Sequence, residues 1–381
     1  MTLSHNFKIC HVVNNLSGKA DGVFAHLKAQ IKNLDENFEH TVITSYDPKL
    51  KEILTENKIN SEFLSDFSRN FSIKSLFELY KIIRYKNFDI INAHSIKALL
   101  FTSLLNLFLN KPLIFSYHGL FIKNDYNTFM EKIIYRLAFF VLLNIRKTIA
   151  IVPSQKSKEL LLNETKLFKN ISHYYNGEAV IELGVEEKSQ LSNLINIIKK
   201  KDKLVAFVGR FDREKNVFRA LRIFSRAMEL YPNISLLLFG DGEYEEELNK
   251  TIRELNIRNV LVFGYVQNVS IYMKYFDCLL ITSNREGLPI IVWEAMYYGL
   301  PVLSTDVGGI REIIENNKCG MVFNKNDEFE GVKKLVEILS NDELRKRMSM
   351  NGKVAITTKY TKDSFKDFFE NLYLNLLYEK T

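Results

Sequence analysis

Hydrophobic positions in the first half of the chain alternate between short apolar runs and longer amphipathic stretches. Ile9–Val13 is a short run, the small-residue loop NNLSGKADG follows it, and a helical pattern extends over Val23–Leu34. Such runs are typical of strands. They recur at Phe88–Ala93, before a helical stretch after Ser95, and at His40–Thr44, Leu113–Tyr117 and Thr148–Val152. Because strands that alternate with helices form parallel sheets, this half predicts an α/β domain.

The same alternation restarts in the second half. Its apolar runs, each followed by a helix-like segment, are Leu204–Val208, Ile234–Phe239, Val260–Phe263, Cys278–Thr282 and Pro301–Ser304. Between the halves, the charged segment EEKSQLSNLINIIKKKDK contributes little apolar surface and ends in lysines, which indicates a linker. A chain of 381 residues also exceeds what one hydrophobic core usually organises. We therefore predict two doubly wound, Rossmann-like domains, residues 1–185 and 204–360, joined by a linker at 186–203.

Two further apolar stretches need an interpretation. Lys362–Leu377 carries phenylalanines and leucines at helical spacing, so we expect residues 361–381 to form an amphipathic helix that packs back on the body of the protein. Ile133–Ile151 is apolar, but Arg136, Arg146 and Lys147 interrupt it. Its uninterrupted part is far below the roughly 20 residues that a bilayer requires, which favours a buried helix and a strand over a membrane span.

Composition narrows the classes of partner and the compartment. The chain is 46% hydrophobic and 25% charged with six prolines, as in an ordered globular protein. Its net charge of +7 would suit nucleic acid, an anionic membrane or an anionic substrate. No arginine-rich arm or RNA-binding aromatic motif is present, so we expect no nucleic-acid partner. Cys10, Cys278 and Cys319 suggest neither a disulfide frame nor a zinc site, and the N-terminal apolar run is too short for a signal peptide, which favours the cytoplasm.

Two motifs follow predicted strands of the second domain. After Val208, the segment GRFDREKN places Arg210 and Lys215 on a loop that leads into a helix, where cations and backbone N–H groups suit a diphosphate. Taken alone, such a pair is often only solvated. The segment FGDGEYEEEL resembles the start of a dinucleotide fingerprint, but Glu245 stands where the third glycine would be. This disfavours a dehydrogenase and favours a tight turn before an acidic helix start.

The most informative region follows Cys278–Thr282 and reads NREGLPIIVWEAMYYGLP. In it, Glu286 is expected on the loop and Glu294 two helical turns later. If both were helical, their spacing of eight residues would be about 12 Å, so they cannot form a paired general acid and base. We expect them to hold different parts of one extended ligand, one carboxylate on a sugar and the other on a ribose. The backbone N–H groups of Gly287 and Leu288 would then face phosphate. A structural coincidence is disfavoured by the surrounding motifs.

Four segments, GRFDREKN, FGDGEYEEEL, EGLP to EAM, and STDVGGIREII, occur in the order and spacing of one known family. The chain resembles the retaining glycosyltransferases of family 4, which have the GT-B fold. The resemblance covers essentially the whole second domain, and more loosely the first through FDIINAHS, FSYHGLF and the pair Asn176-Gly177. It implies two domains that face a central cleft, the first for the acceptor and the second for the nucleotide sugar.

The resemblance assigns roles to residues of the second domain. Arg210 and Lys215 would hold the donor diphosphate, and Glu294 would hold the ribose hydroxyls. Glu286 would contact the donor sugar as a catalytic residue. By the same resemblance, the base would meet the backbone at Val266, and Gly308 and Gly309 would lie near the pocket.

In the first domain, the resemblance points to His118, which ends a strand and would face the transferred sugar across the cleft. His94 also ends a strand, but a structural role is the preferred interpretation. The first loop departs from the family pattern of adjacent glycines, because Ala20 and Asp21 stand between Gly18 and Gly22. We expect Gly22 to keep the close approach of the backbone to the donor.

The expected enzyme transfers a hexose-like unit, from a UDP-sugar in preference to other donors, to a hydroxyl with retention at the anomeric carbon. Its acceptor would be a saccharide or lipid-linked saccharide of a bacterial surface polymer. No metal or cofactor is expected, since no Asp-x-Asp motif stands at a strand end. The basic balance and the aromatic, lysine-containing stretch Leu120–Tyr135 suggest peripheral contact with the inner face of the membrane. The alternatives are an epimerase or phosphorylase of the GT-B fold, and a noncatalytic protein that binds sugar nucleotides.

Overall fold

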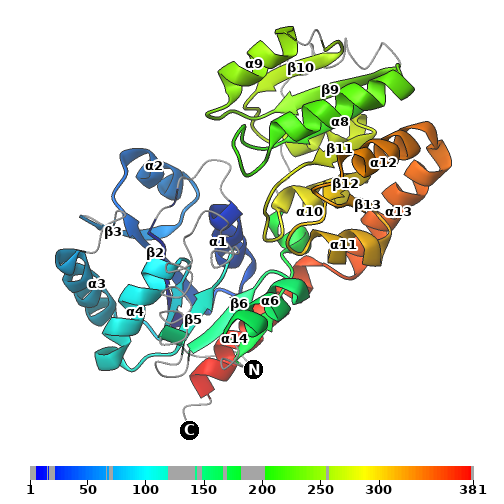
Figure 1. The fold of residues 1–381 in the computed structure, drawn as a ribbon. Helices are drawn as coiled ribbons and strands as arrows, with labels where there is room; N and C mark the ends of the chain where they lie inside the picture. Colours follow the sequence, from blue (N-terminus) through cyan, green and yellow to red (C-terminus); the bar gives the residue numbers. More distant parts are fainter. Residues whose placement is uncertain are drawn as a thin grey trace. The chain divides into compact units, whose positions relative to one another are not determined.

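The computed structural model describes residues 6–14, 16, 22–65, 67, 72–118, 142–143, 148–165, 170–181, 202–254 and 257–378. The chain divides into two compact units (Figure 1). One comprises residues 1–180 together with 362–381, and the other comprises residues 181–361. Of the predicted linker at 186–203, only the last two residues are described, and Lys203 already belongs to a strand.

The N-terminal unit contains a parallel sheet of seven strands in the order β3-β2-β1-β4-β5-β6-β7. The strands are β1 (Phe7–Val12), β2 (Phe38–Ser45), β3 (Asn60–Leu64), β4 (Ile90–Ala93), β5 (Leu113–Ser116), β6 (Thr148–Val152) and β7 (Ile171–His173). The helical elements are α1 (Gly22–Asn33), α2 (Pro48–Glu56), α3 (Ile73–Lys86), α4 (Ile96–Leu109), α6 (Gln155–Thr165), the 3₁₀ turn η1 (Gly177–Val180) and α14 (Lys362–Tyr378). The predicted parallel α/β domain is confirmed.

Both faces of this sheet are buried, which explains why its central strands read as continuous apolar runs. Successive residues of β2 point into different cores. Val42 packs with Phe24 of α1 and Leu50 of α2, whereas Ile43 belongs to the core that includes Leu79 of α3 and residues of α4. Helices therefore cover the sheet on both sides, as the doubly wound prediction requires.

The C-terminal unit contains a parallel sheet of six strands in the order β10-β9-β8-β11-β12-β13. The strands are β8 (Lys203–Val208), β9 (Ile234–Phe239), β10 (Val260–Gly264), β11 (Cys278–Ile281), β12 (Val302–Thr305) and β13 (Gly320–Phe323). The helical elements are α8 (Val217–Leu230), α9 (Glu245–Glu254), the 3₁₀ segment η2 (Val269–Tyr275), α10 (Ile290–Tyr298), α11 (Ile310–Asn317), α12 (Glu328–Ser340) and α13 (Asp342–Thr358). This second α/β unit is also confirmed.

Gly240 and Gly242 bring two loops of the C-terminal unit into backbone contact. A Cβ atom on Gly240 would lie 1.9 Å from the carbonyl oxygen of Gly209, and one on Gly242 would lie 2.6 Å from that of Phe211. The N–H of Phe211 donates to the carbonyl of Asp241 at 2.7 Å. The glycines thus allow the loop after β9 to support the loop after β8, which is a larger role than the tight turn expected from the sequence.

The last helix, α14, returns to the N-terminal unit. The Phe369 ring is fully buried, and its centroid lies 5.1 Å from that of Tyr174 and 5.8 Å from that of His26. The carboxylate of Glu370 accepts a hydrogen bond from the N–H of Asp35 at 2.9 Å. The C-terminal segment is therefore part of the N-terminal core, and it lies over the histidines described below.

In the described ranges, no helix combines the length and the apolar composition needed to cross a membrane. The apolar stretch Ile133–Ile151, interpreted from the sequence as a helix and a strand, lies mostly outside these ranges. Its end forms β6, a buried strand of the sheet. Leu120–Tyr135, suggested as a membrane contact, lies entirely outside them.

Substitution Phe369→Ala should destabilise the N-terminal unit. Removing a fully buried phenylalanine costs about 3 to 5 kcal/mol, through lost apolar burial and the cavity that remains. Urea unfolding followed by circular dichroism measures the effect. Lys366→Ala, a partly exposed position on the same helix, is the control and should leave the midpoint nearly unchanged. Equal midpoints for the two variants would contradict the assignment of α14 to the N-terminal core.

Candidate functional site

The candidate donor site lies where β8 and β11 end, side by side in the middle of the C-terminal sheet. From β8, the chain builds β9 and β10 on one side and β11, β12 and β13 on the other. Ligands of open α/β sheets bind at such a reversal of strand order. The two loops that follow β8 and β11 are fastened together, because Asn284 donates from its N–H to the carbonyl of Glu214 at 2.7 Å and from Nδ2 to that of Arg213 at 2.6 Å.

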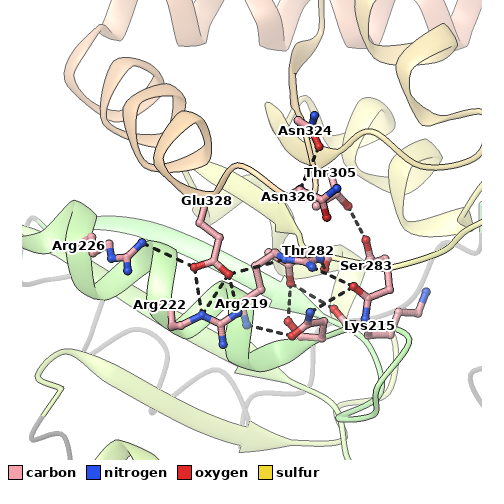
Figure 2. A network of polar contacts seen from close by, with 12 residues as sticks. Lys215, Arg219, Arg222, Arg226, Thr282, Ser283, Thr305, Asn324, Asn326 and Glu328 are labelled. Carbon is pink, nitrogen blue, oxygen red and sulfur yellow. Dashed lines mark hydrogen bonds and ion pairs between the residues drawn. The ribbon is translucent and has the colours of Figure 1, made fainter.

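Lys215 and Glu286, predicted from separate motifs, form an ion pair across these loops. Lys215 Nζ lies 2.6 Å from Glu286 Oε1, and the exposed fractions of the two side chains are 25% and 10%. The Ser283 hydroxyl donates to the same carboxylate oxygen at 2.6 Å. The Thr305 hydroxyl donates to the carbonyl of Ser283 at 2.8 Å (Figure 2). The bonds from Lys215 and Ser283 both fall on Oε1. Among the described residues nothing bonds Oε2, which leaves that oxygen for a ligand.

Arg210 lies on the same loop as Lys215, and Asp212 organises both. One Asp212 oxygen pairs with Arg210 Nε at 2.8 Å, and the other accepts the N–H of Lys215 at 2.8 Å. The Arg210 side chain is 61% exposed, so it can reorient toward an anion. The structure therefore places the two predicted cations on one loop, immediately before α8.

The two glycines of the DVGG segment support the loop that carries Glu286. Gly308 adopts φ of +59°, and a Cβ atom there would lie 2.2 Å from the carbonyl oxygen of Gly287. The N–H of Gly309 donates to that same carbonyl at 2.7 Å. Only glycine at position 308 permits this approach, since a side chain would push the Glu286 loop away.

The remaining predicted donor residues are on or beside two other elements of the C-terminal unit, α10 and β10. Leu288 is buried just before α10, so the N-terminus of this helix adjoins the Lys215–Glu286 pair. Glu286 is on the loop, as expected from the sequence, and Glu294 is half-buried within α10. Val266 follows β10, two strands from β8.

Arg219 of α8 is a supporting residue that the sequence analysis missed. It is buried, and its guanidinium donates to the carbonyl of Thr282 at 2.7 Å and to Asn284 Oδ1 at 2.9 Å. Burial lowers the pKa of Arg219, and the nearby carboxylate of Glu328 opposes this shift. Arg222 hydrogen-bonds Glu328 and thereby lowers the pKa of that carboxyl group (Figure 2). The sequence feature that could have identified Arg219 is the spacing of Arg219, Arg222 and Arg226, which places all three on one face of α8.

In the N-terminal unit, His118 is one end of a chain of four histidines joined through their ring nitrogens. His118 Nε2 lies 2.9 Å from His94 Nδ1, and His94 Nε2 lies 2.9 Å from His11 Nδ1. His11 Nε2 then lies 2.8 Å from His40 Nδ1. His94, for which a structural role was preferred, thus contacts His118 directly. His11 and His40 were not singled out from the sequence.

These histidines are held uncharged. Burial lowers the pKa of His40 to about 3 and that of His26, whose ring packs against His118, to about 4. Burial also lowers the pKa of His11, His94 and His118 well below the ordinary value, and neighbouring imidazoles add to the effect. All five rings are therefore neutral at physiological pH.

Gly22, the other predicted residue of this unit, is exposed at the first position of α1, and Gly18 lies outside the described residues. Over the described part of the chain, no group of three or more His, Cys, Asp or Glu side chains is arranged to hold a metal ion.

Comparisons with known proteins identify the family and the fold. Residues 190–355 match the family described as Glycosyl transferases group 1, and residues 20–177 match Glycosyltransferase Family 4. An uncharacterized glycosyltransferase of Methanocaldococcus jannaschii is 30% identical over 302 residues, which are 74% of this chain and 73% of the relative. The UDP-Gal:alpha-D-GlcNAc-diphosphoundecaprenol alpha-1,3-galactosyltransferase of Escherichia coli is 23% identical over 366 residues, 91% of each chain.

A solved structure shows the same fold. HepE from Anabaena, in complex with UDP, superposes with a TM-score of 0.78 and 18% sequence identity, over 96% of this chain and 99% of HepE. The two parallel-sheet units are those of the GT-B fold. With its family matches and its relative in Methanocaldococcus jannaschii, the chain belongs to the family 4 glycosyltransferases and is a transferase of the GT-B type.

Proposed function

We propose that this glycosyltransferase moves a sugar from a UDP-sugar to a hydroxyl of a saccharide or lipid-linked saccharide, with retention at the anomeric carbon. The Lys215–Glu286 ion pair, beside the N-terminus of α10, is the observation that carries the proposal. The solved HepE contains UDP, and the name of the Escherichia coli relative specifies UDP-Gal and a diphosphoundecaprenol acceptor. The product would belong to a bacterial surface polysaccharide or another glycan.

The donor diphosphate would be bound by Arg210, Lys215 and the backbone N–H groups of Gly287 and Leu288. Cations and a helix N-terminus stabilise the negative charge that develops on a departing diphosphate. This is electrostatic catalysis, and the proposal includes no metal ion or other cofactor. We also expect the backbone near Gly22 to approach the donor.

The two acids would bind the two sugars of the donor. Glu286 would accept hydrogen bonds from the transferred sugar through Oε2, because Oε1 already accepts from Lys215 and Ser283. Glu294 would bind the ribose hydroxyls, and the backbone at Val266 would meet the base.

The state of the Glu286 carboxylate bears on the path by which retention would be achieved. Its charge is offset by Lys215, and Ser283 hydrogen-bonds the same oxygen, so it is a weak nucleophile. We therefore infer a front-face path in which the departing diphosphate oxygen accepts the proton of the acceptor hydroxyl. His118 would hydrogen-bond the transferred sugar and so act as a catalytic residue.

The lipid-linked acceptor requires access to a membrane, and one surface of the N-terminal unit suits it. On α3, the side chains of Ile73, Phe77 and Tyr85 are 76%, 58% and 90% exposed, and Lys81 Nζ lies 4.6 Å from the centroid of the Phe77 ring. We call the exposed residues Ile73, Lys74, Phe77, Lys81, Arg84 and Tyr85 the α3 surface. Exposed aromatic residues among cations favour the interface of an anionic bilayer. We infer that the α3 surface contacts the inner face of the membrane.

The donor assignment predicts a preference among nucleotide sugars. In a panel of UDP-, GDP- and ADP-sugars, a UDP-sugar should raise the thermal unfolding midpoint most, because bound donor stabilises the folded state. The same sugar should be transferred to a lipid-linked saccharide with an unchanged anomeric configuration, as measured by NMR of the product. An inverted product would contradict retention. A converted sugar nucleotide formed without any acceptor would indicate an epimerase instead.

Two neighbouring ion pairs provide a matched test of the site. Lys215→Ala and Glu286→Gln should each lower kcat about 100-fold or more, the usual effect of removing one group that stabilises transition-state charge. The residues immediately before them, Glu214 and Arg285, pair at 3.0 Å across the same two loops. Arg285→Ala should change kcat less than about threefold, as expected for a partly exposed pair. Near-normal turnover in Lys215→Ala or Glu286→Gln, with the fold intact by circular dichroism, would refute the assignment.

The α3 surface predicts binding to vesicles that contain phosphatidylglycerol. Binding should weaken as sodium chloride rises from about 0.05 to 0.5 M, because salt screens the cations. The double substitution Phe77→Ser with Tyr85→Ser should lower the partition coefficient about tenfold or more, since it removes two exposed apolar anchors. Phe329→Ser is the control, because Phe329 is 59% exposed and Lys333 Nζ lies 4.6 Å from its ring in the other unit. Equal loss in both proteins would contradict a specific surface.

A further inference from the structure

The order of the strands builds the chain of four histidines. His40 is on β2, His11 is on β1, His94 follows β4 and His118 follows β5, and these four strands are neighbours in that order. The strand register aligns His11 with Val42 and with Asn92, so His40 and His94 each stand two residues from alignment with His11. Side chains two residues apart share a face of the sheet. The four rings therefore lie on one face of the sheet, each shifted two residues along the strands from its neighbour. We call these four residues the histidine chain.

The hydrogen bonds of the histidine chain are coupled. A neutral imidazole has one N–H donor and one acceptor nitrogen. If His40 Nδ1–H donates to His11, then His11 must donate from Nδ1 to His94, His94 must donate from Nδ1 to His118, and the last proton is on His118 Nδ1. In the reverse arrangement every bond points the other way, and the last proton is on His40 Nε2. Because burial keeps the rings neutral, only these two arrangements satisfy all three bonds.

The His40 end decides between the two arrangements. His40 Nε2 is buried, and among the described residues it has no hydrogen-bond partner. A buried N–H without an acceptor is rarer in proteins than an acceptor with an unused lone pair. The reverse arrangement would leave such an N–H at His40, whereas the first arrangement leaves only a lone pair there. His118 is half-buried beyond the end of its strand, where Nδ1–H can meet a ligand.

His26 is a neighbour of the histidine chain, but it does not change the two possible proton arrangements. Its Nδ1 lies 2.8 Å from Asn176 Oδ1, which only accepts, so His26 carries its proton on Nδ1. Its Nε2 lies 3.3 Å from the Tyr174 hydroxyl. Burial raises the pKa of Tyr174 far above physiological pH, so that hydroxyl also stays uncharged. His26 packs on His118 at a centroid distance of 4.9 Å without joining the histidine chain.

We propose that His40, His11 and His94 are positioning residues that hold His118 in the tautomer with its proton on Nδ1, so that the enzyme presents a neutral hydrogen-bond donor to an oxygen of the transferred sugar. The proposal rests on the sugar-facing role given to His118 in the proposed function. In this tautomer, Nδ1 has no lone pair with which to accept a proton. His118 thus orients a sugar oxygen by donation and does not act as a general base at that atom.

Nitrogen NMR of the histidine side chains tests the tautomer directly. In the protein with ¹⁵N-labelled histidine at neutral pH, His118 should show a protonated, pyrrole-type Nδ1 and an unprotonated, pyridine-type Nε2. The spectrum of His118→Phe identifies the signals by their loss. A pyrrole-type Nε2, or an imidazolium with both nitrogens protonated, would overturn the proposal, whatever the enzyme transfers.

Two substitutions at His94 separate tautomer control from packing. The amide nitrogen of Asn can take the place of Nδ1, whereas that of Gln takes the place of Nε2. His94→Asn should keep the donor to His118, its pyrrole-type Nδ1 and a kcat within about threefold of the wild type. His94→Gln should lose that donor, shift His118 toward protonation on Nε2 and lower kcat at least about tenfold, with little change in KM for the donor. Equal spectra and equal kcat in the two variants would overturn the proposal that the histidine chain controls the tautomer of His118.

The outcomes also distinguish this proposal from the proposed function. If the wild-type spectrum shows the expected tautomer but His118→Phe transfers sugar at the normal rate, the tautomer control stands and the catalytic role of His118 fails. If His118→Phe loses turnover but the wild-type His118 carries its proton on Nε2, the catalytic role stands and the proposed control of the tautomer fails.

Discussion

The ion pair between Lys215 and Glu286 is the contact around which the C-terminal unit is arranged. Both charged groups are largely shielded from water. An unpaired carboxylate or ammonium there would lose solvation energy that no other interaction replaces, so each group needs a partner of opposite charge. Ser283 supplies a second donor to the carboxylate. Gly308 allows the loop after β12 to pack against the backbone of the Glu286 loop. Arg219 holds the same loop from α8. Each of these residues acts on the position of one carboxylate.

The two units apply the same principle with different chemistry. In each sheet, the polar groups gather where the strand order reverses, between β8 and β11 in one unit and around β1 and β4 in the other. The C-terminal unit uses charged groups that are fixed by ion pairs. The N-terminal unit uses imidazoles whose pKa values burial lowers, so its polar core carries no net charge. α14 extends this apolar cover, since Phe365 and Phe369 pack on His26.

The sequence predicted the central strands because both faces of each sheet are buried, which makes those strands continuously apolar. It missed β3, β7 and β13, which are three of the four edge strands; the fourth, β10, reads VLVFG and was predicted. The missed strands are short or partly polar, so their pattern is weak; β3, for example, reads NSEFL. Lys215 and Glu286 were each singled out from a motif whose role the family resemblance supplied, but the ion pair between them was not predicted. The histidine chain could not be predicted locally, because partners such as His11 and His94 meet only through the order of the strands.

In the proposed function, charged groups would meet the diphosphate of the donor and neutral groups would meet its sugar. A diphosphate gains negative charge as it departs, so fixed cations such as Lys215 stabilise the transition state more than the bound substrate. The sugar carries no anion, and a cation placed against it would attract the diphosphate in the ground state. A neutral donor such as the His118 imidazole can orient a sugar oxygen without that competition. Under the proposed role of His118, the burial that lowers the histidine pKa values would serve function as well as packing.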